Sequence, residues 1–209
     1  MSTQDLNDTT ECCWIETIDT PAESDPLHAM YQEVGAAHGK IHNLYKAFSL
    51  QPKPLIAADR HYRDILHNEQ NQSEPWLLEL LASQVAIIAE CDYALTNHGA
   101  NFAALLGDKV KATRMLEAVT NDDFEQPELF TAKQAALLQY GAKLSRRPEQ
   151  MREQDIEDLR KIGVSDTEIL EAVQATSCFA YWVRFINALG IQLGNESVGL
   201  FDEAGNPRV

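Results

Sequence analysis

A glutamate, a cysteine and a histidine stand close together in the stretch of sequence best suited to acid–base or thiol chemistry. Glu79 lies in the run from Trp76 to Ala89, which is otherwise nearly all apolar, and Cys91 and His98 follow it. A thiolate is a nucleophile, and an imidazole changes charge near neutral pH. A buried carboxylate must be paired or neutral. These three residues are therefore the candidate catalytic residues.

The spacing of these residues along helices restricts which of them can meet. Residues i and i+4 are neighbours on a helix, so Ala94 sits beside His98, whereas Cys91 lies roughly 10 Å from His98 along the axis. Glu79 and Cys91 would be roughly 18 Å apart on one unbroken helix. We therefore predict a break near Glu90 that folds one helix back on the next. Cys91 would then stand near a helix N-terminus, where the helix dipole favours a thiolate.

The stretch from Glu79 to His98 resembles the active-site pattern of the alkylhydroperoxidase D-like, or carboxymuconolactone decarboxylase-like, family. That pattern is a Glu followed about a dozen residues later by Cys-x-Tyr-Cys-x-x-x-His, and this sequence matches it everywhere except at Ala94. Three further segments resemble the longer, peroxidase-related branch of the family, namely residues 39–44, 166–170 and 187–191. Together they extend the resemblance over most of residues 27–201.

The resemblance implies a role for each matching residue. In the family the inner cysteine attacks a peroxide, a His and a Glu relay the proton, and the outer cysteine resolves the sulfenic acid. Carried over, Ala94 has lost the nucleophile and Cys91 keeps the resolving position, while Glu79 and His98 keep the relay. A disulfide cannot form within this motif. The resemblance also implies a homo-oligomer, and we expect no cofactor.

Three functions remain open from the sequence. The first, favoured by the overall match, is a peroxidase-related oxidoreductase that reduces alkyl hydroperoxides through Cys91, with an external thiol reductant or a distant resolving thiol. The second is a carboxymuconolactone decarboxylase-like enzyme in which His98 and Glu79 move protons on a lactone or keto acid. The third is a catalytically inactive family member that retains only the scaffold. In both active cases the partner is a small-molecule substrate.

Other cysteines and histidines are candidates for a site outside this motif. His38 and His42 have the i, i+4 spacing of a helical metal pair, but a third ligand is not evident, and we expect no metal site. Cys12 and Cys13 are adjacent in a polar arm, and they could resolve an oxidised Cys91 only if that arm reaches it.

Aromatic residues and one arginine gather on the last long helix that we predict. Trp182 and Arg184 could line the pocket or an oligomer interface. An Arg in an apolar helix needs a carboxylate partner, and Glu79 is a candidate for that role. Three more aromatic side chains are interpreted as core or interface residues, namely Phe179, Tyr181 and Phe185.

Apolar positions recur at helical spacing along most of the chain and seldom alternate with polar ones, so we predict an all-α protein, an alkylhydroperoxidase D-like helical bundle. The expected helices span residues 27–34, 41–48, 55–66, 76–89, 91–106, 110–119, 127–144, 154–162 and 165–189. Ser73 is the expected N-cap of the helix at 76, and Pro127 is expected to open another. Equal intervals from Cys91 to Gly107 and from Cys178 to Gly194 suggest a duplicated helical unit.

Length, composition and charge restrict the class of protein and its partners. The 209 residues, 44% of them hydrophobic, suffice for a core, and a net charge of −15 would repel nucleic acid. Apolar runs are shorter than the roughly 20 residues of a membrane span. The N-terminus lacks the features of a secretory signal, so we expect a cytoplasmic protein. We divide the chain into a polar arm, residues 1–25, and one all-α domain, residues 26–209, with active-site helices at about 75–106.

Overall fold

A computed structural model describes residues 12–35 and 41–208 of the chain. Within these ranges it contains nine α-helices and a short 3-10 helix, and its only β pairing is an isolated bridge between Phe201 and Pro207. The helices are α1 (Pro26–Gly35), α2 (Asn43–Lys46), α3 (Lys53–Leu66), α4 (Pro75–Ile88), α5 (Asp92–Leu106), α6 (Lys109–Thr120), α7 (Ala132–Arg146), α8 (Glu153–Lys161) and α9 (Asp166–Leu189). The all-α prediction is confirmed.

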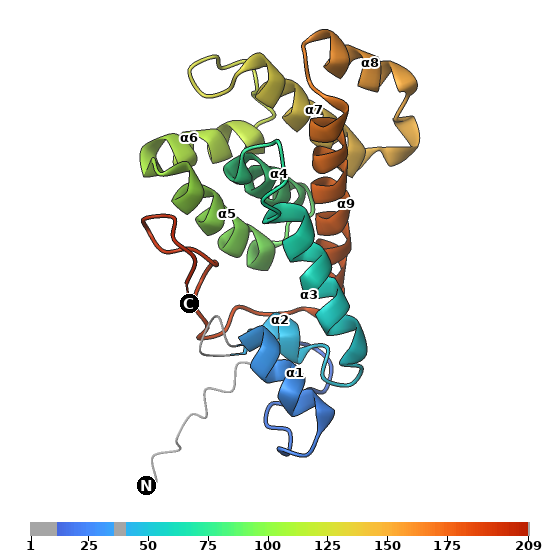
Figure 1. Cartoon of the computed structure of the whole chain (residues 1–209), viewed down its shortest axis with the longest axis vertical. Helices are drawn as coiled ribbons and strands as arrows, with labels where there is room; N and C mark the ends of the chain where they lie inside the picture. Colours follow the sequence, from blue (N-terminus) through green and yellow to red (C-terminus); the bar gives the residue numbers. More distant parts are fainter. Residues whose placement is uncertain (1–11, 36–40, 209) are drawn as a thin grey trace, which may run out of the picture.

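Helix α4 is the centre of the bundle. It packs against α5, α7 and α9, while α1 and α2 lie at the opposite end of the molecule from α6, α7 and α8 (Figure 1). Every residue of α4 from Leu77 to Ala86 is buried. This follows from its composition, because a helix that is apolar on all sides must be covered on all sides. Glu79 is therefore carried into the middle of the core.

The turn between α4 and α5 contains the predicted break. Glu90 has a φ of 51°, and the N–H groups of Glu90 and Cys91 donate to Ile87 O and Ala86 O at 3.1 and 2.9 Å. These two bonds form a Schellman motif, which usually has glycine at the left-handed position. The motif reverses the chain, so α5 packs against α4 and brings its middle turns level with Glu79.

The predicted N-cap of α4 is wrong. The helix begins at Pro75 with Glu74 in the capping position, one residue after Ser73. The backbone N–H groups of Gln72 and Ser73 instead donate to the two carboxylate oxygens of Glu171 on α9, at 2.7 and 2.8 Å. A long-range carboxylate thus holds the segment that leads into α4, and the local sequence does not reveal this contact.

The predicted start of α7 is also wrong. Residues 127–130 form a turn, and α7 begins at Ala132 after a capping box between Thr131 and Gln134. The Thr131 side chain accepts from the Gln134 N–H, and the Gln134 side chain accepts from the Thr131 N–H. A reciprocal cap of this kind satisfies two backbone N–H groups at the start of a helix. Pro127 offers no such cap, so the helix starts after Thr131.

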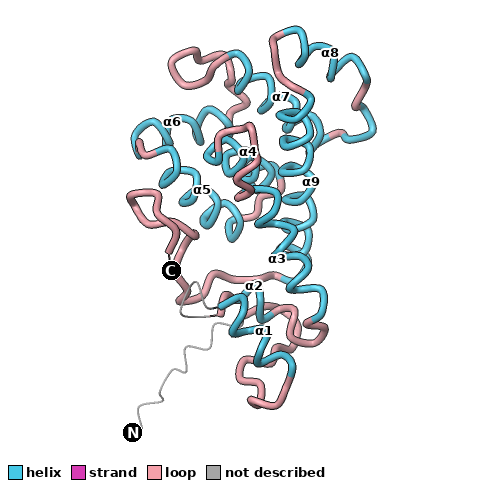
Figure 2. Tube along the Cα trace, in the orientation of Figure 1, coloured by secondary structure: helices cyan, strands magenta, loops and turns pink. Residues whose placement is uncertain are grey.

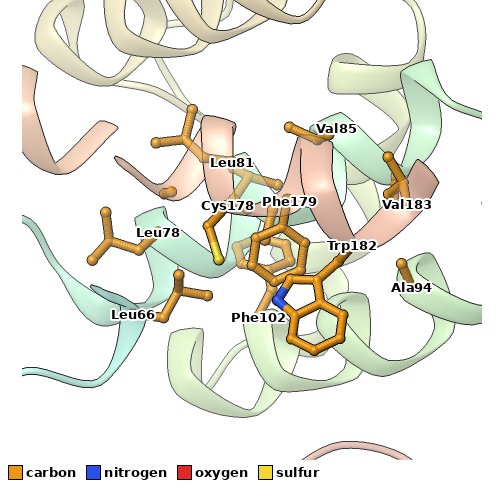
Figure 3. Close-up of a cluster of buried hydrophobic side chains, with 14 of the residues drawn as sticks. Leu66, Leu78, Leu81, Val85, Ala94, Phe102, Cys178, Phe179, Trp182 and Val183 are labelled. Atoms are coloured by element: carbon orange, nitrogen blue, oxygen red, sulfur yellow. The ribbon is translucent and has the colours of Figure 1, made fainter. Parts of the chain in front are cut away.

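Aromatic side chains of α5 and α9 fill the core next to α4. Phe179 and Trp182 of α9 lie between Phe102 and Ala94 of α5 (Figure 3). Phe102 and Phe179 have no exposed surface, and Trp182 is nearly as buried. Cys178 belongs to the same cluster (Figure 3). These large rings hold α5 and α9 apart at the level where the candidate catalytic residues lie.

After α9 the chain runs past α2 and then along α5 without regular helix (Figure 2). The N–H of Gly199 donates to Asn97 Oδ1 at 3.1 Å, and that of Leu200 donates to Asn101 Oδ1 at 2.6 Å. Gly199 has a φ of 74°, and a Cβ atom at this position would lie 2.7 Å from Asn101 Oδ1. Glycine is therefore needed for this close approach to α5.

The equal intervals from Cys91 to Gly107 and from Cys178 to Gly194 do not correspond to a structural repeat. Cys91 is the N-cap of α5, whereas Cys178 lies in the middle of α9. Gly107 ends α5 in the left-handed conformation, whereas Gly194 lies beyond the end of α9.

None of the helices described is both long enough and apolar enough to cross a membrane.

Candidate active site

The structure brings two of the three candidate residues, Glu79 and His98, into direct contact. Glu79 lies on α4 with none of its surface exposed, and its Oε2 is 2.8 Å from Nδ1 of His98 on α5. The antiparallel packing of α4 and α5 creates this contact between residues that are nineteen positions apart. Because Glu79 occupies Nδ1, the other ring nitrogen of His98, Nε2, is left for other partners.

Glu79 has two further polar partners on its other oxygen. Asn101 Nδ2 donates to Oε1 at 3.1 Å, and His67 Nε2 lies 3.3 Å from the same atom. The predicted pairing of Glu79 with Arg184 is wrong, because Arg184 is exposed and its guanidinium donates to Ala180 O on its own helix. The ion pairs that Glu79 makes within the described chain are with imidazoles.

A buried carboxylate without an Arg or Lys needs another source of positive charge or a proton of its own. Burial lowers the pKa of His67, and this effect exceeds the opposing influence of Glu79, so His67 is held in its neutral form. The buried carboxylate of Glu79 therefore depends on its hydrogen bonds, and the shortest of its three side-chain contacts is the one to His98 Nδ1, at 2.8 Å. The arrangement resembles a carboxylate–histidine pair in which the carboxylate orients the ring and stabilises its charged form.

A cavity of about 60 Å³ lies beside this pair. Its lining includes His98, Ala94, Trp182, Phe179 and Leu200. The ring of Phe179 stands edge-on to that of His98 with centroids 4.4 Å apart, so the imidazole is held from one side by an aromatic ring and from the other by a carboxylate. One water molecule needs roughly 10–15 Å³ of such a cavity, so this one has room for a small molecule.

The charges around the cavity are nearly balanced. Asp59 is the one carboxylate in its lining, and Lys and Arg are absent from the lining residues described. The two oxygens of Asp59 accept hydrogen bonds from Tyr45 Oη at 2.7 Å and from Arg63 Nε at 2.8 Å. Burial raises the pKa of Tyr45, with Asp59 adding to the effect, so Tyr45 remains a hydroxyl donor. The cavity therefore favours an uncharged molecule over an anion.

Cys91 is not brought to this cavity. It is the N-cap of α5, as predicted, but its side chain is only 2% exposed and does not line the cavity. Burial raises the pKa of the Cys91 thiol, and the opposing hydrogen bond from the backbone of Ala94 is the smaller effect. The helix N-terminus was expected to favour a thiolate, but loss of hydration outweighs that influence here.

The remaining cysteines lie outside the cavity, and all four are free thiols. The Cys12 thiol donates to Asn43 O, and that of Cys13 donates to Ile15 O. Burial raises the pKa of Cys12 to about 12, so this thiol is also a poor nucleophile at neutral pH. Neither Cys12 nor Cys13 of the arm forms a disulfide with Cys91.

The spacing of His38 and His42, which was considered for a metal pair, can be judged only in part. His42 precedes α2 and lines the cavity, whereas His38 lies outside the described residues. His67, Glu79 and His98 are residue types that bind metals, but their nitrogen and oxygen atoms bond directly to one another. In the described ranges no three His, Cys, Asp or Glu side chains are arranged to hold a metal ion.

The contacts of Glu79 with Asn101 and His67 were not predicted from the sequence, whereas Trp182 was considered as a residue of the pocket lining. Trp182 lines the cavity, which was one of the two roles considered for it. Asn101 follows His98 by three positions on α5, and this spacing alone could have indicated a shared helix face. His67 lies just past the end of α3, in a polar stretch interpreted as a loop, and nothing nearby in the sequence links it to Glu79.

Comparison of the structure with solved structures finds similar proteins. No protein-family model and no curated protein sequence matches it. An uncharacterized peroxidase-related protein from Silicibacter sp. TM1040 is similar with a TM-score of 0.75 and 23% identity, over 91% of this chain and 96% of its own. A second, from Ralstonia eutropha JMP134, is described as an alkylhydroperoxidase AhpD core, with a TM-score of 0.73 and 19% identity, over 88% and 94% of the two chains.

The chain has the AhpD-like fold. The expectation based on the motif is confirmed at the level of fold. A cysteine-to-alanine variant of the debrominase Bmp8, in complex with 2,3,4-tribromopyrrole, is also similar, with a TM-score of 0.66 and 14% identity, over 87% of this chain and 94% of its own. Proteins named for different activities thus share the AhpD-like fold, so the activity must be argued from the site itself.

Proposed function

We propose that the chain is an enzyme that transfers protons on a small, uncharged substrate, with His98 as the general acid–base and Glu79 as its partner. One observation carries the proposal. The His98–Glu79 pair borders a cavity in which Ala94 stands where the resemblance places a nucleophilic cysteine, and Cys91 does not line it. The site thus retains a proton carrier next to the substrate space but has no thiol there.

The proposed step needs no co-reactant. Nε2 of His98 takes a proton from an acidic C–H or O–H of the substrate, and the electron pair of that bond stays on the substrate. The same nitrogen then returns a proton to another atom of the substrate. While Nε2 takes up and returns the proton, Glu79 accepts a hydrogen bond from Nδ1–H, which orients the ring and stabilises the imidazolium that forms. Oriented acid–base catalysis of this kind contributes about 10² to 10⁴ in rate.

The charge of the lining narrows the substrate class. Of the lactone and keto acid considered from the sequence, a keto acid carries a carboxylate, but the described cavity offers Asp59 and no Lys or Arg. A small aldehyde, ketone or neutral lactone fits both the charge and the volume of about 60 Å³. We therefore favour an uncharged carbonyl compound over the acids considered from the sequence.

Peroxidase chemistry is the second candidate, supported by two observations. Solved structures with this fold include proteins named peroxidase-related, and the Cys91 sulfur accepts a hydrogen bond from the Ala94 backbone at the start of α5. In this reaction the thiolate of Cys91 would attack a hydroperoxide, breaking the O–O bond to give a sulfenic acid and an alcohol. An external thiol would then reduce the sulfenic acid.

Two assays on the same variants separate these candidates. The first follows exchange of the α-protons of small ketones and aldehydes in D₂O by NMR, and the second follows peroxide consumption with dithiothreitol. Proton transfer by His98 predicts that exchange survives Cys91→Ser and falls by about 10² or more in His98→Ala. Loss of peroxide consumption in Cys91→Ser would support the peroxidase instead. An inactive scaffold would show neither activity in the wild-type protein.

A further inference from the structure

The two imidazoles on Glu79 face different spaces. His98 lines the inner cavity, whereas His67 lines an open groove of about 800 Å³ between the end of α3 and the C-terminal segment. Leu200 lines both, so it forms part of the wall between them. Glu79 is fully buried between the two histidines and contacts one with each oxygen. A chain of titratable groups therefore leads from the cavity through the protein to the groove.

We propose that His67 is a relay residue that passes protons between Glu79 and water in the outer groove. The inference rests on the proposed function. When His98 has given a proton to the substrate or taken one from it, the relay supplies the route by which the ring regains its original charge. His67 does not touch the substrate space, so it acts through Glu79 and is not a catalytic residue. Its side chain is 19% exposed, which gives one end of the ring access to water.

The transfer can be written with every proton accounted for. His98 gives its Nδ1 proton to Oε2 of Glu79, and a half-turn of the carboxyl group brings that proton to the side of His67. His67 accepts it on Nε2, the atom 3.3 Å from Oε1, and releases its Nδ1 proton to water in the groove. One proton has then moved from the cavity to the groove, and His98 is left as the neutral tautomer with its proton on Nε2. The reverse sequence returns the proton to Nδ1. No bond between heavy atoms changes.

Tyr62 is placed to hold His67 in either protonation state. Its Oη lies 3.0 Å from His67 Nε2, and its ring stands edge-on to both His67 and His98, with centroids 5.4 and 5.7 Å away. Burial raises the pKa of Tyr62 well above its usual value, with Glu79 adding to the effect, so the hydroxyl keeps its proton. A hydroxyl can donate to a bare Nε2 or accept from a protonated one. It therefore orients the ring while Nε2 is bare, and it must turn its O–H away from Nε2 when the proton arrives from Glu79.

The C-terminal segment contacts the two residues that lie against Oε1 of Glu79. Phe201 packs against the ring of His67 with centroids 5.4 Å apart. Leu200 N donates to Asn101 Oδ1, which leaves the amide nitrogen of Asn101 directed at Glu79 Oε1. The segment thus contacts two of the three polar partners of Glu79. It holds these two side chains in place, and its Leu200 separates the cavity from the groove.

A purely structural role for His67 makes a different prediction from a relay. If His67 only satisfies an oxygen of Glu79, a glutamine that donates a similar hydrogen bond should replace it. If it carries a proton, glutamine should fail. His67→Gln is therefore the informative variant. His61→Gln is its matched control, because His61 is an exposed histidine on α3, the helix that His67 follows, and it lines neither the cavity nor the groove.

The experiment measures how fast the ring N–H proton of His98 exchanges with water, by NMR on protein with ¹⁵N-labelled histidine and without substrate. The relay predicts that His67→Gln slows this exchange by about tenfold or more, while His61→Gln leaves it unchanged. An unchanged rate in a folded His67→Gln protein would overturn the proposal. Since no substrate is present, this result does not depend on the assay of His98→Ala, and the two proposals can fail separately.

A second variant covers the case in which glutamine disturbs the fold. His67→Ala opens space beside the groove, and added imidazole should restore fast exchange at His98 because it can carry a proton there. Pyrazole has the same shape but is a much weaker base, and it should not restore exchange. Equal rescue by both rings, or by neither, would contradict the relay.

Discussion

Ala94 and His98 line the same cavity from successive turns of α5. A side chain at position 94 therefore faces the substrate space beside the imidazole. The cavity has alanine and not a thiol at this position.

Restoring a thiol at this position tests whether only the nucleophile is missing. We predict that Ala94→Cys gains peroxide consumption with dithiothreitol, because the new thiol would lie beside His98 and one turn from Cys91. Mass spectrometry should detect a disulfide from residue 91 to residue 94 after oxidation. Ala100→Cys, on the same helix but outside the cavity lining, should gain neither property. Absence of both in Ala94→Cys would mean that the pocket cannot support thiol chemistry.

The contact between Glu79 and His98 should matter for stability. Removal of one member of a buried pair leaves the other uncompensated, so we predict that His98→Ala lowers the free energy of unfolding by about 3 kcal/mol. The double variant with Glu79→Leu should lose less than the sum of the two single changes. Urea unfolding measures each value. Strict additivity would show that the two side chains do not interact, and His61→Ala, a control at an exposed site, should change stability by less than about 0.5 kcal/mol.

The lowered pKa of His67 predicts an acid-sensitive component of stability. Its ordinary value is 6.5, and burial holds it below this in the folded protein, so the unfolded chain binds the proton more readily. Stability should therefore be highest above pH 6.5 and fall as the pH drops from 6.5 through the folded-state pKa. His67→Gln should flatten this part of the curve of unfolding free energy against pH. His42, whose pKa burial also lowers, should account for part of the slope that remains.

The turn that reverses the chain between α4 and α5 holds a residue in a conformation that favours glycine. We predict that Glu90→Gly raises the free energy of unfolding by about 0.5–1 kcal/mol, because φ is 51° in a Schellman motif. Glu90→Ala should give no such gain, since alanine has the same steric conflict. Thermal unfolding of the two variants compares them directly, and a destabilised Glu90→Gly protein would contradict the prediction.

Sequence reasoning was accurate where local rules decide the structure. Helical periodicity predicted most helices, and the distance between Glu79 and Cys91 required the break observed at Glu90. The helix expected at 165–189 is α9, which begins after a capping box at Ser165. These features depend on residues a few positions apart, so a single sequence contains the information.

The same reasoning failed where distant segments decide. The pairing of Glu79 with Arg184 depended on how α9 is rotated against α4, and the rotation turns Arg184 to solvent. The helix dipole predicted a thiolate at Cys91, but the surrounding core buries the thiol and raises its pKa. His67 reaches Glu79 from the end of another helix. The packing of distant segments determines all three features, namely the exposure of Arg184, the burial of Cys91 and the contact of His67 with Glu79.

The central claim is that His98, and not Cys91, is the chemically active group of the cavity. The most direct measurement compares the exchange of substrate α-protons with D₂O in the wild-type protein, His98→Ala and Cys91→Ser. The account predicts exchange in the wild type, nearly the same rate in Cys91→Ser, and a loss of about 10² or more in His98→Ala. Exchange that persists in His98→Ala, or disappears in a folded Cys91→Ser protein, would contradict it.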